Sequence, residues 1–166
     1  DIDILDDKQS LLIRDIIISE LGDTIERIGK FPKRALFYRR SGDEFRKKST
    51  KIFNLEKGKA QLEVLASGTQ CIIFGTHPET KQSYQWIDES PLEVHSEDLP
   101  RVNLKQVKNI ITQSETLLQN HVVQKEVIIS TIKTSINEHK RVEGIKDIPL
   151  VRSALSYIDP EDYNIW

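Results

Sequence analysis

The chain has 166 residues, of which 30% are charged and 37% hydrophobic, and its formal net charge is −2. These values are typical of one globular domain with a small appendage, and they exclude a disordered chain. No run approaches the roughly 18 apolar residues of a membrane span, so we expect no membrane partner. The only cysteine, Cys71, lies in an apolar run and allows no internal disulfide. We therefore expect a buried thiol and a cytoplasmic location.

The first hundred residues predict a strand, a helix and then several short strands. DIDIL at 1–5 alternates acidic and apolar residues, and residues 8–21 carry the apolar stripe of a helix. Further strands are expected at TIERIG (24–29), RALFYR (34–39), KIFNL (51–55), AQLEVLA (60–66), QCIIFG (70–75) and YQWID (84–88), with a charged loop at 41–49. Because turns such as EKGK join neighbouring strands, we predict an α+β fold with a mostly antiparallel sheet and a flanking helix.

The composition changes after Pro100. Residues 103–141 contain no Gly or Pro, and their apolar residues recur with a helical period. They predict one long helix, or two if Asn120–His121 interrupts it. After a linker, residues 150–158 predict a short helix, and Asp159 and Pro160 are typical of the start of another.

Three acids are candidate metal ligands. Asp1 and Asp3 lie two residues apart in a strand, so their side chains point to the same face. Glu63 lies inside the apolar strand 60–66, where a carboxylate needs a partner. Carboxylates from two strands suit hard divalent cations such as Mg²⁺. The alternatives are that Asp1 and Asp3 are solvated, and that Glu63 pairs with a nearby lysine or arginine.

A basic stretch lies between them in the sequence. Residues 30–51 hold nine lysines and arginines against two acids. Such local charge favours a polyphosphate or nucleic-acid backbone, and the alternative is a solvated rim. We take Arg46, Lys47 and Lys48 as candidate nucleic-acid contacts. His77, in the turn GTHP, either donates to a phosphate or sugar or is a structural turn residue.

These motifs together resemble a known family. DID, PKRALFYR, EVLASGTQCIIFGTHPETKQSYQW and SALSYIDPEDYNIW, in this order, are similar to the bifunctional DNA primase/polymerase domain. That domain belongs to the archaeo-eukaryotic primase superfamily and is common in phage, plasmid and prophage replication proteins. The resemblance covers residues 1–100 and suggests a catalytic domain truncated at its N-terminus. Residues 101–146 form a helical linker region in this interpretation, and 147–166 resemble the start of a primase C-terminal module that joins a helicase.

The resemblance implies nucleotidyl transfer on a single-stranded DNA template. Asp1, Asp3 and Glu63 correspond to the family's ligands for Mg²⁺ or Mn²⁺, and Lys33, Arg34, Arg40 and His77 to its nucleoside triphosphate contacts. The family's middle motif contains a histidine that KFPKRALFYR lacks. That difference supports an alternative, a non-catalytic single-stranded nucleic-acid-binding or adaptor domain; a metal-dependent nuclease is a third possibility. Since both ends interrupt a pattern, we expect a fragment that is inactive alone.

Overall fold

The computed structural model describes the backbone of residues 1–141 and the side-chain surroundings of residues 1–133. Residues Asp1–Lys125 form one compact unit, and residues from Glu126 onward group separately. The helices expected at 150–158 and after Asp159 lie outside the described residues. Among the residues that are described, no helix is long and apolar enough to span a bilayer.

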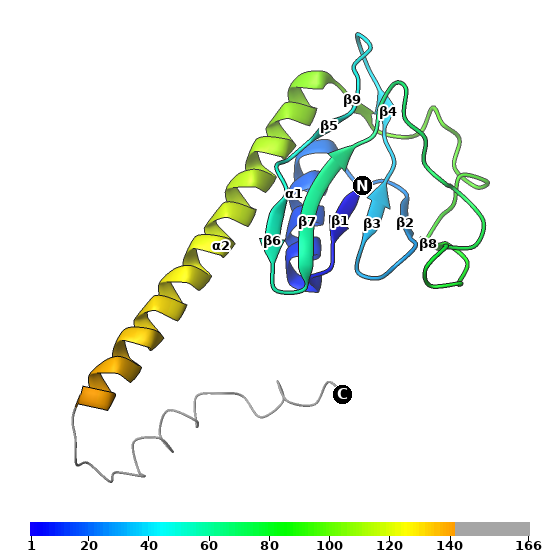
Figure 1. Cartoon of the computed structure of the whole chain (residues 1–166). Helices are drawn as coiled ribbons and strands as arrows, with labels where there is room; N and C mark the ends of the chain where they lie inside the picture. The colour runs from blue at the N-terminus through cyan, green and yellow to red at the C-terminus, as the bar shows by residue number, and fades with distance from the viewer. Residues whose placement is uncertain (142–166) are drawn as a thin grey trace. The chain divides into compact units, whose positions relative to one another are not determined.

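The first unit is built on a seven-stranded sheet with the order β5-β7-β1-β3-β2-β8, in which β6 also pairs with β7 (Figure 1). The strands are β1 (Ile2–Ile4), β2 (Glu26–Ile28), β3 (Arg34–Leu36), β5 (Lys48–Ser49), β6 (Phe53–Leu55), β7 (Gly58–Val64) and β8 (Gln85–Ile87). Every pairing in this sheet is antiparallel. A separate parallel pair joins β4 (Arg39–Arg40) to β9 (Arg101–Val102). The predicted α+β class with a mostly antiparallel sheet is therefore confirmed.

Two helices accompany the sheet. Helix α1 (Asp7–Leu21) ends at Gly22, whose positive φ of 92° suits glycine. Helix α2 (Leu104–Arg141) is continuous, which decides between the one-helix and two-helix alternatives. Asn103 and Gln106 bond reciprocally at its start: each side-chain oxygen accepts from the other's backbone N–H, at 3.1 and 3.2 Å. This capping box satisfies two donors and fixes where the helix begins.

The core lies on one face of the sheet. Ile2 and Ile4 alternate with the acids of β1 and are fully buried. They form one apolar cluster with residues of α1, of β7 and of the first turns of α2, including Ile13, Ile17, Leu62, Val107, Ile110 and Leu118. Residues 104–118, assigned from the sequence to a linker region, thus complete the same core as the strands. The period of two along β1 leaves Asp1 and Asp3 on the opposite face.

Three local predictions were wrong. QCIIFG is irregular rather than a strand, and its Ile72 and Phe74 are 55% and 48% exposed. Cys71 is partly exposed rather than buried. The charged segment 41–49, expected to be a loop, contributes β5 against β7. The two errors in strand assignment have one cause. A strand forms only where another strand can hydrogen-bond to it, and that partner is set by non-local pairing.

Replacing Asp6 by alanine is expected to destabilise the protein by about 1 kcal/mol. The Asp6 Oδ1 atom accepts a hydrogen bond of 3.0 Å from the Gln9 backbone N–H at the start of α1. Without the carboxylate, that donor has no side-chain acceptor. Urea unfolding would measure the loss, with Asp6→Asn as the matched control, because asparagine is an equally good cap and should retain most of the stability.

Candidate functional site

The register of β1 and β7 brings the predicted acids together on one face. Ile2 pairs with Leu62, and one step further the Glu63 N–H donates to the Asp1 carbonyl oxygen at 2.8 Å. The Asp1 amine donates back to the Glu63 carbonyl oxygen at 2.7 Å. Asp1 and Glu63 are therefore directly opposed, which places their Cβ atoms about 5 Å apart. Asp3 lies two residues along β1 on the same face.

Two of these acids are already paired with lysines. Lys33 Nζ lies 2.5 Å from Asp3 Oδ1, and Lys47 Nζ lies 2.6 Å from Glu63 Oε1. Within the described residues, no three acidic, histidine or cysteine side chains are close enough to hold a metal ion. The predicted alternative for Glu63, pairing with a neighbouring cation, is what the structure shows. The donor types fit a hard cation, but Asp3 and Glu63 reach it only after leaving their lysines.

A cavity of about 410 Å³ lies beside the acids. Asp1 and Glu63 belong to its wall together with aromatic residues (Phe37, Tyr38 and Phe45) and two cations, Arg39 and Arg40. Burial raises the pKa of Tyr38 above its usual range, in keeping with the apolar character of the wall. Cavities of this size and composition hold small organic ligands. Three carboxylates (Asp1, Glu44 and Glu63) and two guanidinium groups supply its charge.

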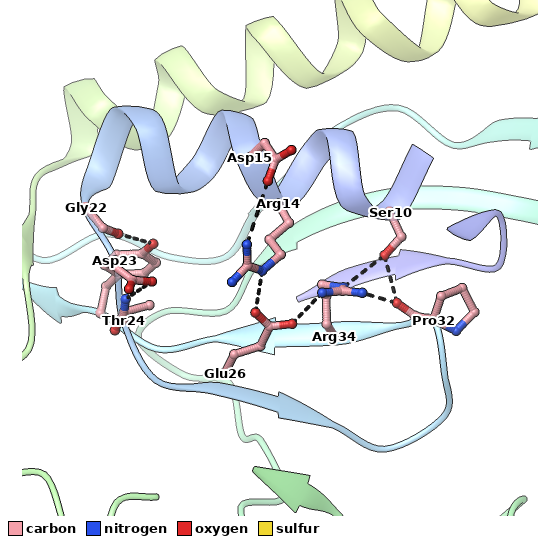
Figure 2. A network of polar contacts seen from close by, with 10 residues as sticks. Ser10, Arg14, Asp15, Gly22, Asp23, Thr24, Glu26, Pro32 and Arg34 are labelled. Atoms are coloured by element: carbon pink, nitrogen blue, oxygen red, sulfur yellow. Dashed lines mark hydrogen bonds and ion pairs between the residues drawn. The ribbon is translucent and has the colours of Figure 1, made fainter. Parts of the chain in front are cut away.

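Arg34 faces away from the acids. Its strand position pairs with Ile2, so its side chain enters the space between the sheet and α1. There Arg34 Nη1 lies 2.6 Å from Glu26 Oε1, while Arg14 Nε bonds Glu26 Oε2 at 2.5 Å (Figure 2). This bond raises the pKa of Arg14 above its ordinary value. With 7% of its side chain exposed, Arg34 is a structural residue, so the sequence-based role in nucleotide contact does not fit its position.

The side chain of His77 stabilises the turn in which it lies. Its Nδ1 atom accepts hydrogen bonds from the backbone N–H groups of Glu79 and Thr80, at 3.2 and 3.3 Å. Its ring meets Tyr84 edge-on at 5.5 Å. A Cβ atom on Gly29 would lie only 2.4 Å from the Tyr84 ring, so glycine is required for this packing. The turn-residue interpretation of His77 is therefore the one that its contacts support.

Ion pairs neutralise most of the positive charge of the basic stretch at residues 30–51. Six of its nine cations lie in ion pairs with acids, namely Lys30, Lys33, Arg34, Arg39, Arg40 and Lys47. Arg46 and Lys48 are exposed and have no ion pair among the residues that the structure describes. Of the predicted nucleic-acid contacts, these two are free to meet a polyanion, whereas Lys47 must first leave Glu63.

Sequence reasoning missed Glu26 and Arg27, two adjacent charges that are both buried, at 3% and 7% exposed. Because successive residues of β2 point to opposite faces of the sheet, Glu26 lies on the same face as Arg34. Arg27 lies on the face that carries Asp1, Asp3 and Glu63. The signal was the segment TIERIG itself. Opposite charges on adjacent residues of an otherwise apolar strand indicate that both of its faces are covered.

No protein-family model, curated protein or solved structure matches this chain. The resemblance to the primase/polymerase domain is therefore a hypothesis that depends on the residues and on their geometry. The register of the acids is the geometric observation most relevant to it.

Proposed function

We propose that this chain is part of a nucleotidyltransferase of the primase/polymerase type, which adds nucleotides to a 3′-hydroxyl on a single-stranded DNA template. One observation carries the proposal: Asp1 lies directly opposite Glu63 on adjacent strands, with Asp3 on the same face. Carboxylates from two strands at this spacing suit the binding of divalent cations. The cavity next to them has the size expected for a nucleoside.

Each polar group has a role in this proposal. Asp1, Asp3 and Glu63 would hold Mg²⁺ or Mn²⁺, which supplies charge stabilisation to the attacking and leaving oxygens of the transfer. Lys33 and Lys47 neutralise two of the carboxylates in the structure. If Asp3 and Glu63 bind the metal ions instead, the ammonium groups of Lys33 and Lys47 become available to bind the triphosphate. Arg40, in the cavity wall, adds a third cation for the same purpose.

We expect the chain to bind a deoxynucleoside triphosphate in the presence of Mn²⁺ and the double variant Asp1→Ala/Asp3→Ala to bind it at least about tenfold more weakly. Removing two carboxylates removes most of the negative charge that attracts the cation. Titration calorimetry measures the binding, and extension of a labelled primer is the second readout. Release of pyrophosphate, rather than cleavage of the strand, separates this activity from that of a nuclease.

The matched control is Glu89→Gln, which removes an exposed carboxylate from outside the site. It should bind the triphosphate as the wild type does. Equal Mn²⁺-dependent binding by the double variant and the wild type would refute the proposed role of these acids.

A second function is supported by a specific observation. The lysines on Asp3 and Glu63 occupy the candidate metal ligands, and Arg46 and Lys48 stay exposed. These features also suit a non-catalytic domain that binds single-stranded nucleic acid. Such a domain would bind an oligonucleotide in EDTA with strong salt dependence, and Glu63→Gln would not reduce that binding or any metal-dependent property.

A further inference from the structure

Arg27 is a buried cation with no counter-ion in the described part of the chain. It lies in β2, and only 7% of its surface is exposed. Within the described residues no acid lies at ion-pairing distance from it, and its Nε and Nη1 atoms are buried with no hydrogen-bond partner. Because a guanidinium stays protonated in proteins, this charge cannot be removed by deprotonation. A buried, unpaired charge of this kind is strongly unfavourable.

Arg34, on the neighbouring strand β3, is a second buried arginine with which Arg27 can be compared. It is exposed to the same extent, 7%, but it bonds Glu26 at 2.6 Å. Since the register pairs Arg27 with Ala35, the neighbour of Arg34, the two guanidinium groups leave the sheet on opposite faces. The face of Arg27 is the one that carries Asp1, Asp3 and Glu63, but none of the acids that the structure describes forms an ion pair with its guanidinium.

Trp86 adds a third donor to the same place. It is the cross-strand partner of Arg27 on β8, the edge strand of the sheet, and its Nε1 atom is likewise buried without an acceptor. Aromatic rings fix the guanidinium: its Cζ atom lies 4.3 Å from the centroid of the Tyr84 ring and 5.9 Å from that of Phe37. Phe37 in turn contacts Trp86, at 5.1 Å between centroids. Three donor nitrogens therefore lie among tilted aromatic rings, and no residue that the structure describes accepts a hydrogen bond from them.

We propose that Arg27 and Trp86 form an oxyanion-binding site for a phosphate group. The fork of a guanidinium matches two oxygens of a phosphate, and the indole N–H can donate to a third. Tyr84 and Trp86 are only partly buried, so the donors lie near the surface, from which an anion can approach them. If the proposed function holds, the phosphate belongs to a nucleotide or to the nucleic-acid strand, because the site shares its face with the acids.

The test is binding of inorganic triphosphate in EDTA, which separates this site from any metal-dependent one. The Trp166→Phe background leaves Trp86 as the only fluorophore of its kind, since the chain has two tryptophans. We expect a saturable change in Trp86 fluorescence, at least tenfold weaker binding in Arg27→Gln, and intermediate binding in Arg27→Lys, which keeps the charge but loses the fork. Arg101→Gln, which removes an exposed arginine from outside the basic stretch, is the control and should bind within twofold of the parent.

Urea unfolding distinguishes an anion site from a merely structural arginine. Without anion, Arg27→Gln should unfold at the same or a higher urea concentration than the parent, because an uncompensated charge is gone. Triphosphate should raise the midpoint of the parent but not that of Arg27→Gln. Unchanged affinity in Arg27→Gln, or a parent that binds no triphosphate, would overturn the proposal.

A parallel titration with a single-stranded oligonucleotide identifies the source of the phosphate. Tighter binding of the oligonucleotide that depends on Arg27 assigns the site to the strand, and tighter binding of triphosphate assigns it to the free nucleotide. Because both titrations are run in EDTA, loss of metal-dependent transfer in the Asp1→Ala/Asp3→Ala variant leaves their result unaffected. The two proposals can therefore fail separately.

Discussion

Replacing Glu26 by alanine is expected to lower the free energy of unfolding by about 3–5 kcal/mol. The Glu26 carboxylate is 4% exposed and accepts from both Arg14 and Arg34. Arg34 is equally inaccessible, so removing Glu26 leaves a buried charge with only neutral acceptors: the Ser10 hydroxyl at 3.3 Å and the Pro32 carbonyl at 3.4 Å. Urea denaturation monitored by circular dichroism measures the loss.

Two further variants show whether the charge is the cause. Asp15 also contacts Arg14, at 3.7 Å, but its side chain is 68% exposed, so Asp15→Ala should cost less than about 0.5 kcal/mol. The double variant Glu26→Leu/Arg34→Met should recover most of the lost stability, because an apolar pair can replace a buried ion pair at little cost. A Glu26→Ala protein within about 1 kcal/mol of the wild type would contradict the role of Glu26 as the counter-ion.

The parts of the fold that the sequence predicts are those set by local periodicity. The helical period gives α1 and α2, and the alternation in DIDIL predicts the separation of the acids from Ile2 and Ile4. EKGK predicts the hairpin of β6 and β7, with Gly58 at a positive φ of 123°. Placing Glu63 opposite Asp1 needs the strand order as well, because β1 and β7 are far apart in the chain.

The parts that could not be predicted depend on non-local pairing. Arg34 and Lys33 are adjacent and equally basic, yet Lys33 meets Asp3 while Arg34 meets Glu26 on the other face. A shift of one residue in the register of β3 would exchange the faces on which Lys33 and Arg34 lie. The local sequence does not specify that register. The same reason explains Arg27, whose burial follows from the packing of Tyr84 and Phe37 against β2 rather than from its own strand.

The ion pair between Lys47 and Glu63 leads to the second large expected effect. If Glu63 is a metal ligand, Lys47 competes with the cation for the same carboxylate oxygen, 2.6 Å away. Lys47→Gln should therefore increase the affinity for Mn²⁺, by up to about fivefold, since a partly exposed ion pair contributes up to about 1 kcal/mol. Glu63→Gln should act in the opposite direction and abolish most of the Mn²⁺ binding.

Nucleotide transfer distinguishes the two variants further. Metal ions contribute several kcal/mol to such reactions, so Glu63→Gln should reduce the rate by about 100-fold or more. Lys47→Gln should bind Mn²⁺ more tightly yet transfer more slowly, because the ammonium that leaves Glu63 is the one proposed to bind the triphosphate. Lys57→Gln, which removes an exposed lysine from the turn between β6 and β7, should change neither property. If Lys47→Gln and Glu63→Gln weakened Mn²⁺ binding equally, the pair would be a structural contact and Glu63 would not be a metal ligand.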